Sequence, residues 1–146
     1  MKHLHNNLYV AGQISADDIK ALAANGFTTI INNRPDHEES NQLTHTEAQA
    51  LAAEHGLEYV YLPMANGQPL AESTVDDFKK IVDDPDKKVL AHCRSGMRSS
   101  VIWGLGAIAA GQVSVDEAIS AAGAAGIPLQ NARPLLESAK PRDAKT

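Results

Sequence analysis

The segment KVLAHCRSGMRSS, residues 88–100, joins the most continuous buried-strand pattern of the chain to its most apolar helical pattern. The strand is predicted over Lys88–His92 and the helix over Ser99–Ala110. A strand that passes through a short loop into a helix is the repeating unit of a mainly parallel α/β sheet. The segment therefore predicts an α/β fold. It also places Cys93 just after a strand, at the carboxyl ends of the strands, where ligands bind in such folds.

The same alternation of strand and helix patterns continues through the rest of the chain. No repeat, low-complexity tract or long linker divides it. We therefore predict a single three-layer domain over residues 1–140, with a mainly parallel sheet of four to five strands flanked by helices. Residues 141–146 are polar and predicted to be disordered, and His3 and His5 are placed on a frayed N-terminus. The other predicted strands cover residues 8–10, 27–31 and 59–62, and the other helices begin at Ser15, Thr44, Ser73, Ser114 and Pro134, with capping-box spacing in the pairs Ser15/Asp18, Thr44/Glu47 and Ser114/Glu117.

Composition and charge narrow the class of function. The chain of 146 residues carries 13 Lys and Arg against 18 Asp and Glu, a net charge of −5, which argues against binding to nucleic acid or to an anionic membrane. The single cysteine, Cys93, excludes an internal disulfide and a cysteine-based zinc cluster, and the six histidines show no metal-ligand spacing. No signal-peptide pattern or membrane-length apolar run occurs, so we expect a cytoplasmic protein that needs no metal and no organic cofactor.

The loop after the predicted strand has the composition of an anion-binding site. A tight loop that enters a helix points several backbone N–H groups inward, and Gly96 permits the close approach that this requires. Arg98 is placed to grip two oxygens of a tetrahedral anion. The same positive environment favours the thiolate of Cys93, a nucleophile for phosphorus or sulfur, and Ser99 is expected to donate a hydrogen bond to it. A lone cysteine after a strand is often only a small buried hydrophobe, but that interpretation leaves the arginines and the glycine of the loop unexplained.

At these residues the chain resembles the signature loop of the protein tyrosine phosphatase superfamily, in which His and Cys are followed by Gly, Arg and Ser. Residues 8–13 (LYVAGQ), 30–36 (IINNRPD) and 90–99 (LAHCRSGMRS) resemble the bacterial β-lactamase hydrolase-like protein, phosphatase-like domain family. The resemblance implies a protein tyrosine or dual-specificity phosphatase-like fold with Cys93 as nucleophile and Arg98 as the anion-binding arginine. The substrate-binding loop would comprise Arg94, Ser95, Gly96, Met97, Arg98 and Ser99.

Two features differ from the usual phosphatase pattern. Four residues separate Cys93 from Arg98 where phosphatases have five, and a Cys-Arg-x-Gly-x-Arg loop of this length is similar to rhodaneses, which carry sulfur as a persulfide. Residues 63–69, after the preceding strand, hold no carboxylate where phosphatases place a general acid. Asp36 is the best substitute for the acid, although a turn residue that caps its own backbone is an equal interpretation. Without an acid, expulsion of a poor leaving group slows by about a hundredfold to ten-thousandfold, so phosphatase activity should be slow and favour phenolic or otherwise activated esters.

These residues are compatible with three functions that share an anionic ligand. The first is a cysteine-dependent phosphatase that forms a phosphocysteine at Cys93. The runner-up is a rhodanese-like sulfurtransferase that carries a persulfide on the same sulfur. The third is a non-catalytic module that binds a phosphorylated or sulfur-bearing partner, which would not need the nucleophile. In each case His92 is expected to organise the loop through hydrogen bonds, and Arg34 either adds positive potential at the rim or faces solvent.

Overall fold

A five-stranded sheet in the order β1-β2-β5-β3-β4 forms the centre of the computed structural model, which describes residues 1–139. β1 pairs antiparallel with β2, and the other neighbouring strands are parallel. The mainly parallel α/β sheet predicted from the sequence is thereby confirmed. The strands are β1 Lys2–His5, β2 Leu8–Ala11, β3 Thr29–Asn32, β4 Glu58–Tyr61 and β5 Val89–His92.

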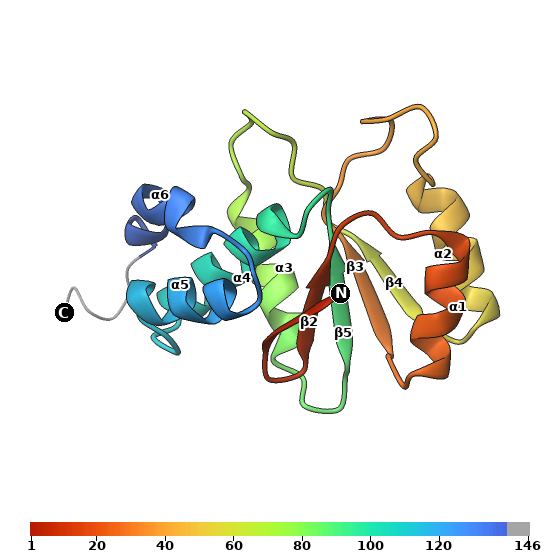
Figure 1. The fold of residues 1–146 in the computed structure, drawn as a ribbon, viewed down its shortest axis with the longest axis horizontal. Coiled ribbons are helices and arrows are strands. Elements are labelled where there is room, and N and C mark those ends of the chain that lie inside the picture. The colour runs from red at the N-terminus through yellow and green to blue at the C-terminus, as the bar shows by residue number, and fades with distance from the viewer. Residues whose placement is uncertain (140–146) are drawn as a thin grey trace.

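Helices cover both faces of the sheet and complete the three layers (Figure 1). α1 and α2 lie on one face, and the remaining helices lie on the other, where α4 packs against α3, α5 and α6. The helices are α1 Ala16–Ala24, α2 His45–Glu54, α3 Glu72–Val82, α4 Met97–Ala109, α5 Val115–Ala124 and α6 Arg133–Glu137, with a 3-10 turn η1 at Leu129–Ala132.

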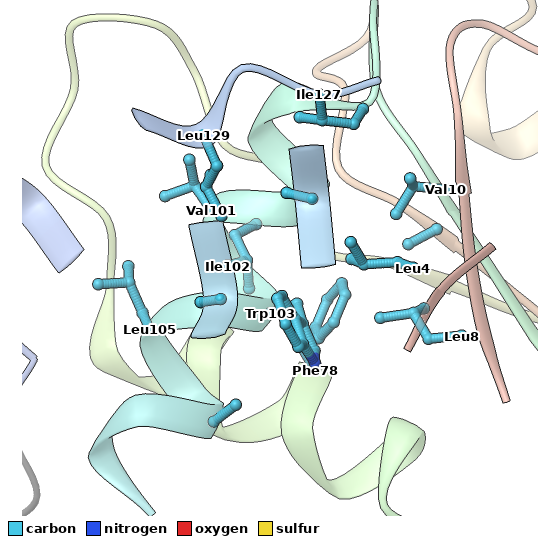
Figure 2. Packing of buried hydrophobic residues seen from close by; sticks show 14 of the residues in the cluster. Leu4, Leu8, Val10, Phe78, Val101, Ile102, Trp103, Leu105, Ile127 and Leu129 are labelled. Carbon is cyan, nitrogen blue, oxygen red and sulfur yellow. The ribbon is translucent and has the colours of Figure 1, made fainter. Parts of the chain in front are cut away.

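Two apolar clusters, one on each face, hold the layers together. The larger lies between the sheet and α3, α4 and α5, where Phe78 and Trp103 pack beside Leu8 and Val10 of β2 (Figure 2). The smaller joins α1 and α2 to the other face through Ile30 of β3 and other buried side chains. The middle strand β5 is buried throughout, so its carboxyl end, where Cys93 follows, is fixed by packing from both sides.

Local signals in the sequence set most helix starts. The side chains of Ser15, Thr44 and Ser114 each accept a hydrogen bond from the backbone N–H three residues later. The acidic side chain there accepts one from the N-cap backbone N–H, so all three capping boxes are confirmed. Such a cap typically stabilises a helix by about 1 kcal/mol.

Other boundaries differ from the prediction. His3 and His5 are not on a frayed end: they belong to β1, which pairs with β2. Helix α3 begins at Glu72 rather than Ser73, with Ala71 as an N-cap that makes no side-chain hydrogen bond. Helix α4 begins two residues before Ser99, because Gly96 takes the left-handed conformation that starts it. Smaller shifts affect β3, which begins at Thr29 rather than Phe27, and α6, in which Arg133 precedes Pro134; the predicted tail 141–146 lies outside the described residues.

Two properties of residues 1–139 bear on membrane and metal binding. None of their helices combines the length and the apolar character that crossing a membrane requires. Within the same residues, no group of three or more His, Cys, Asp or Glu side chains is placed to hold a metal ion.

Candidate functional site

The candidate site lies at the carboxyl ends of the parallel strands, where the loops that follow β2, β3, β4 and β5 meet (Figure 1). His92, the last residue of β5, is in register with Ala11 of β2 and with Asn32 of β3. Asn32 is in turn in register with Tyr61, the last residue of β4. Parallel strands that end in register bring their following loops together, so residues far apart in the sequence become neighbours here.

Cys93 is fully buried at the start of the loop into α4. Its Sγ accepts a hydrogen bond from the backbone N–H of Gly96 at 3.1 Å. Gly96 is the N-cap of α4 and has a φ of 93°, a conformation that other residues rarely adopt. The N-terminus of a 13-residue helix therefore starts beside the sulfur, so the Gly96 N–H group and the positive end of the helix dipole both face it.

The loop after β2 packs against the loop that joins β5 to α4, residues 93–96, here called the Cys93 loop. Gly12 lies so close that a Cβ atom at that position would be 2.7 Å from the carbonyl oxygen of Arg94. The Arg94 side chain itself points outward, is 70% exposed, and lies 3.7 Å from a carboxylate oxygen of Glu39. The Ser95 hydroxyl accepts a long hydrogen bond, 3.4 Å, from the Met97 N–H. Among the predicted loop residues, Arg94 thus contributes its backbone to the loop, while its side chain stays at the rim.

Arg98 lies in the first turn of α4, and its guanidinium is almost fully buried. Nη1 and Nη2 donate to the two carboxylate oxygens of Glu38 at 2.9 and 2.8 Å, and Nη1 also donates to the Met64 carbonyl at 2.8 Å. The hydrogen bonds with Glu38 raise the pKa of Arg98 above its ordinary value despite burial, and the charge of Cys93 adds to the rise. Arg98 therefore stays charged, near the sulfur, and links the loops after β3 and β4.

Glu38 is the central partner of a second arginine as well. The Nε–H of Arg34 donates to Glu38 Oε1 at 2.8 Å, and the Nη groups of Arg34 donate to Gln13 at 3.1 Å and to Glu39 at 2.8 Å. The two arginines lower the pKa of Glu38 to about 2, with the Arg98 hydrogen bond as the main cause, so Glu38 is an anion at any ordinary pH. Arg34 does not face solvent, because its side chain is 2% exposed and paired. That Arg34 adds positive potential at the rim stays a prediction.

Asp36, the predicted substitute acid, is held by the N-terminal end of α2. Its carboxylate accepts the backbone N–H of His45 at 2.8 Å and pairs with the His45 ring Nδ1 at 2.5 Å. The His45 ring stacks on Tyr61 with centroids 4.0 Å apart, and the Tyr61 hydroxyl accepts the Asp36 N–H. Burial raises the pKa of Asp36, but the hydrogen bonds from His45 outweigh it, and the pKa lies below its ordinary value. A carboxyl group held in this way is ionised at neutral pH and has no proton to donate, although its catalytic role stays a prediction.

Two expected hydrogen bonds of the loop are absent. The Ser99 hydroxyl donates to Asn33 Oδ1 at 2.8 Å, so its one proton is not directed to the sulfur. Neither ring nitrogen of His92 has a hydrogen-bond partner of normal geometry among residues 1–139. Burial lowers the pKa of His92 to about 4, against a smaller opposing effect of the Cys93 backbone, so the ring is neutral at ordinary pH. Its role in organising the loop stays a prediction.

Glu38 is the functional candidate that the sequence did not reveal. It follows Asp36 by two residues, and nothing in its local pattern distinguishes it from Glu39 or from other surface acids. One signal in the sequence could have pointed to this loop. It follows a buried strand and contains an arginine and a proline at 34–35 and several acidic residues. In a parallel sheet, a loop at this end of a strand lies beside the Cys93 loop.

Comparisons with known proteins identify related sequences and structures. Residues 1–111 match the family described as beta-lactamase hydrolase-like protein, phosphatase-like domain. The Beta-lactamase hydrolase-like protein of Xylella fastidiosa 9a5c is 32% identical over 134 residues, which is 92% of this chain and 31% of that protein. The chain thus spans about a third or less of the length of the curated relatives it matches.

Solved structures show the same fold. A candidate phosphatase, nma1982 from Neisseria meningitidis Z2491, superposes with a TM-score of 0.83 and is 33% identical, with 95% of this chain and 97% of that chain covered. Tk-PTP in its active form superposes with a TM-score of 0.72 over 94% of this chain and 92% of its own, at 16% identity. At that identity the likeness shows the fold alone, which is that of the protein tyrosine and dual-specificity phosphatases.

Proposed function

This chain belongs to the beta-lactamase hydrolase-like protein, phosphatase-like domain family, and we propose that it is a phosphatase that hydrolyses phosphate monoesters through a phosphocysteine at Cys93. The observation that carries the proposal is the pairing of a buried sulfur that accepts the Gly96 N–H with a charged arginine, Arg98, in the first turn of the same helix. The family and the phosphatase-type fold support the hydrolase class.

The first step is attack of the Cys93 thiolate on phosphorus. An S–P bond forms while the P–O bond to the leaving group breaks, and the oxygen departs with the electron pair. Charge that develops on the remaining phosphoryl oxygens is stabilised by the N–H groups of the loop and by Arg98. In the second step water attacks phosphorus, the S–P bond breaks, and inorganic phosphate leaves as the thiolate is restored.

The state of the neighbouring carboxyl groups limits the substrates. Both Glu38 and Asp36 are held ionised, so neither protonates a leaving oxygen from the positions that they occupy in this structure. Loss of general-acid assistance costs a factor of about a hundred to ten thousand with alkoxide leaving groups and little with acidic phenols. We therefore propose activated esters, such as aryl phosphates, as the preferred class.

The test is hydrolysis of an aryl phosphate between pH 5 and 8 by the wild-type protein and by Cys93→Ser. We expect slow turnover in the wild type, no turnover in the folded variant, and a rate that falls as the leaving phenol becomes less acidic. Absence of turnover in well-folded wild type, or turnover that survives in Cys93→Ser, would rule out the phosphatase proposal.

One specific observation favours a second function, sulfur transfer. Only four residues separate Cys93 from Arg98, and this shorter loop offers fewer amides to the oxygens of a tetrahedral phosphate. A rhodanese-like step needs no general acid: the thiolate attacks a sulfane sulfur of thiosulfate, sulfite departs with the electron pair, and cyanide then removes the outer sulfur as thiocyanate. Thiocyanate formation that requires Cys93, together with no aryl phosphatase activity, would assign the site to sulfur transfer.

A further inference from the structure

Arg34, Glu38 and Arg98 form a continuous chain of ion pairs that the proposed chemistry does not by itself require. Glu38 Oε1 accepts a hydrogen bond from Arg34 Nε and one from Arg98 Nη2, both at 2.8 Å. Oε2 accepts from Arg98 Nη1 at 2.9 Å. A single carboxylate thus holds two guanidinium groups in fixed relative positions. Of the two arginines, only Arg98 lies in α4, the helix that follows the Cys93 loop.

The donors of Arg98 can be counted. A guanidinium has five N–H groups. Glu38 uses one on each Nη, and the Met64 carbonyl uses the second on Nη1. Among residues 1–139, no acceptor takes the Nε–H or the second Nη2–H. These two groups lie parallel along one edge of the guanidinium, the arrangement that grips two oxygens of one anion. Glu38 and Met64 therefore determine which edge of Arg98 is left for a ligand.

We propose that Glu38 is a positioning residue for Arg98, and that Arg34 acts through it. In this assignment the Arg34-Pro35-Asp36 loop orients the anion-binding arginine instead of supplying an acid. The inference rests on the proposed function for its activity readout, because it concerns the same anion site.

Arg34 is suited to hold Glu38 in place. Its side chain is 2% exposed, and it is anchored independently by Gln13 after β2 and by Glu39 in its own loop. Glu38 would otherwise be one of several acids on a long loop with many accessible rotamers. Two fixed guanidinium groups on one carboxylate oxygen remove that freedom. Arg98 is therefore already ordered before a substrate binds, and binding loses less conformational entropy.

The central experiment compares Glu38→Gln with Glu39→Gln, which removes an equal charge from the next residue of the same loop. Glu39 is half exposed and contacts Arg34 but not Arg98, and Arg34 keeps Glu38 and Gln13 as partners when this charge is removed, so we expect at most about a fivefold effect. In Glu38→Gln the amide keeps the shape but cannot accept on both sides, and a misplacement of the order of 1 Å costs about a hundredfold in rate. We expect kcat on an aryl phosphate to fall by about a hundredfold, with a smaller change in KM, and by less than fivefold in Glu39→Gln. Equal kcat values in the two variants would overturn the assignment.

Arg34→Lys tests the other end of the chain. It keeps the positive charge but has one nitrogen where Arg34 contacts three partners, so kcat is expected to fall by roughly tenfold. This variant also replaces Glu38→Gln if the latter fails to fold, as judged by its melting temperature. Wild-type kcat in folded Arg34→Lys would remove Arg34 from the assignment.

A second readout does not depend on turnover. Nuclear magnetic resonance of ¹⁵N-labelled protein, with and without inorganic phosphate, reports rotation of the Arg98 guanidinium. We expect separate Nη–H signals in the wild type and in Glu39→Gln, and averaged signals in Glu38→Gln. Separate signals in Glu38→Gln would overturn the positioning role. A wild type without phosphatase activity that nevertheless shows this pattern would refute the proposed function and leave the positioning role standing.

Discussion

Replacement of Gly12 by alanine is expected to disturb the Cys93 loop from outside it. The new Cβ would lie 2.7 Å from the Arg94 carbonyl oxygen, whereas ordinary contacts of this type begin at 3.4 Å, so the loop must move by about 0.7 Å. The opposing atom is backbone and cannot rotate away. Overpacking of this kind costs about 1–3 kcal/mol, and displacement of a nucleophile by nearly 1 Å costs on the order of ten- to a hundredfold in kcat/KM.

The assay pairs aryl phosphatase kcat/KM with the melting temperature and uses Gly123→Ala as control. Gly123 lies in α5 with nothing within 4 Å of an added Cβ, so alanine there should be neutral or stabilise by up to about 1 kcal/mol. For a chain of this size 1 kcal/mol corresponds to a shift of about 3–4 °C. We expect Gly12→Ala to melt several degrees lower and to react more slowly, and Gly123→Ala to do neither. Wild-type stability and activity in Gly12→Ala would refute the reasoning.

Three further predictions concern ionisation. Because Arg98 lowers the pKa of Glu38 from 4.5 to about 2, its stabilising effect is complete above pH 4.5 and is lost as the pH falls toward 2, so urea unfolding of wild type and Glu38→Gln should converge across that range. Asp36→Asn should cost about 1–3 kcal/mol of stability through the weakened contact with His45 and should leave the pH–rate profile unshifted, and loss of a basic-side limb from the profile would show that Asp36 is the acid. Burial lowers the pKa of His92 from 6.5 to about 4, so the unfolded state takes up a proton first and stability falls as the pH drops from 6.5 to 4; His92→Leu should flatten this part of the stability curve, and an unchanged slope would show that His92 is not its source.

The elements that the sequence predicted best are those with strong local signals. The three capping boxes each satisfy two backbone groups within four residues, so no tertiary contact is needed to start those helices. β1 was missed because Lys2–His5 carries two histidines and a lysine, and it forms a strand only because β2 offers it an edge. Likewise α3 starts at Glu72 without a side-chain cap, since packing of Phe78 and its apolar face on the core fixes the helix.

In the candidate site, too, the contacts within one loop were predictable from the sequence and those between distant segments were not. Cys93, Gly96 and Arg98 lie within six residues, so their proximity follows from one loop and was predictable. Glu38 is 60 residues from Arg98 in sequence, and its contact exists only because β3 and β5 are neighbours in register. Ser99 could not be placed for a related reason: its acceptor, Asn33, lies on the same neighbouring strand end, and a hydroxyl proton goes to the amide oxygen that this pairing brings within reach.

The acidic character of the chain and an anionic substrate are compatible because the acids near the site are already paired. Glu38 is shared by two arginines, Glu39 contacts Arg34, and Asp36 is bonded to His45. Charges farther than about 8 Å away are largely screened at physiological salt, whereas Arg98 is buried and screened much less. Glu38 cancels part of the charge of Arg98 but leaves two N–H donors in a fixed direction. Affinity for an anion at this site therefore depends more on the geometry of those donors than on net charge. For the same reason, loss of the Glu38 contact should lower the rate even though it removes a negative charge from beside the substrate.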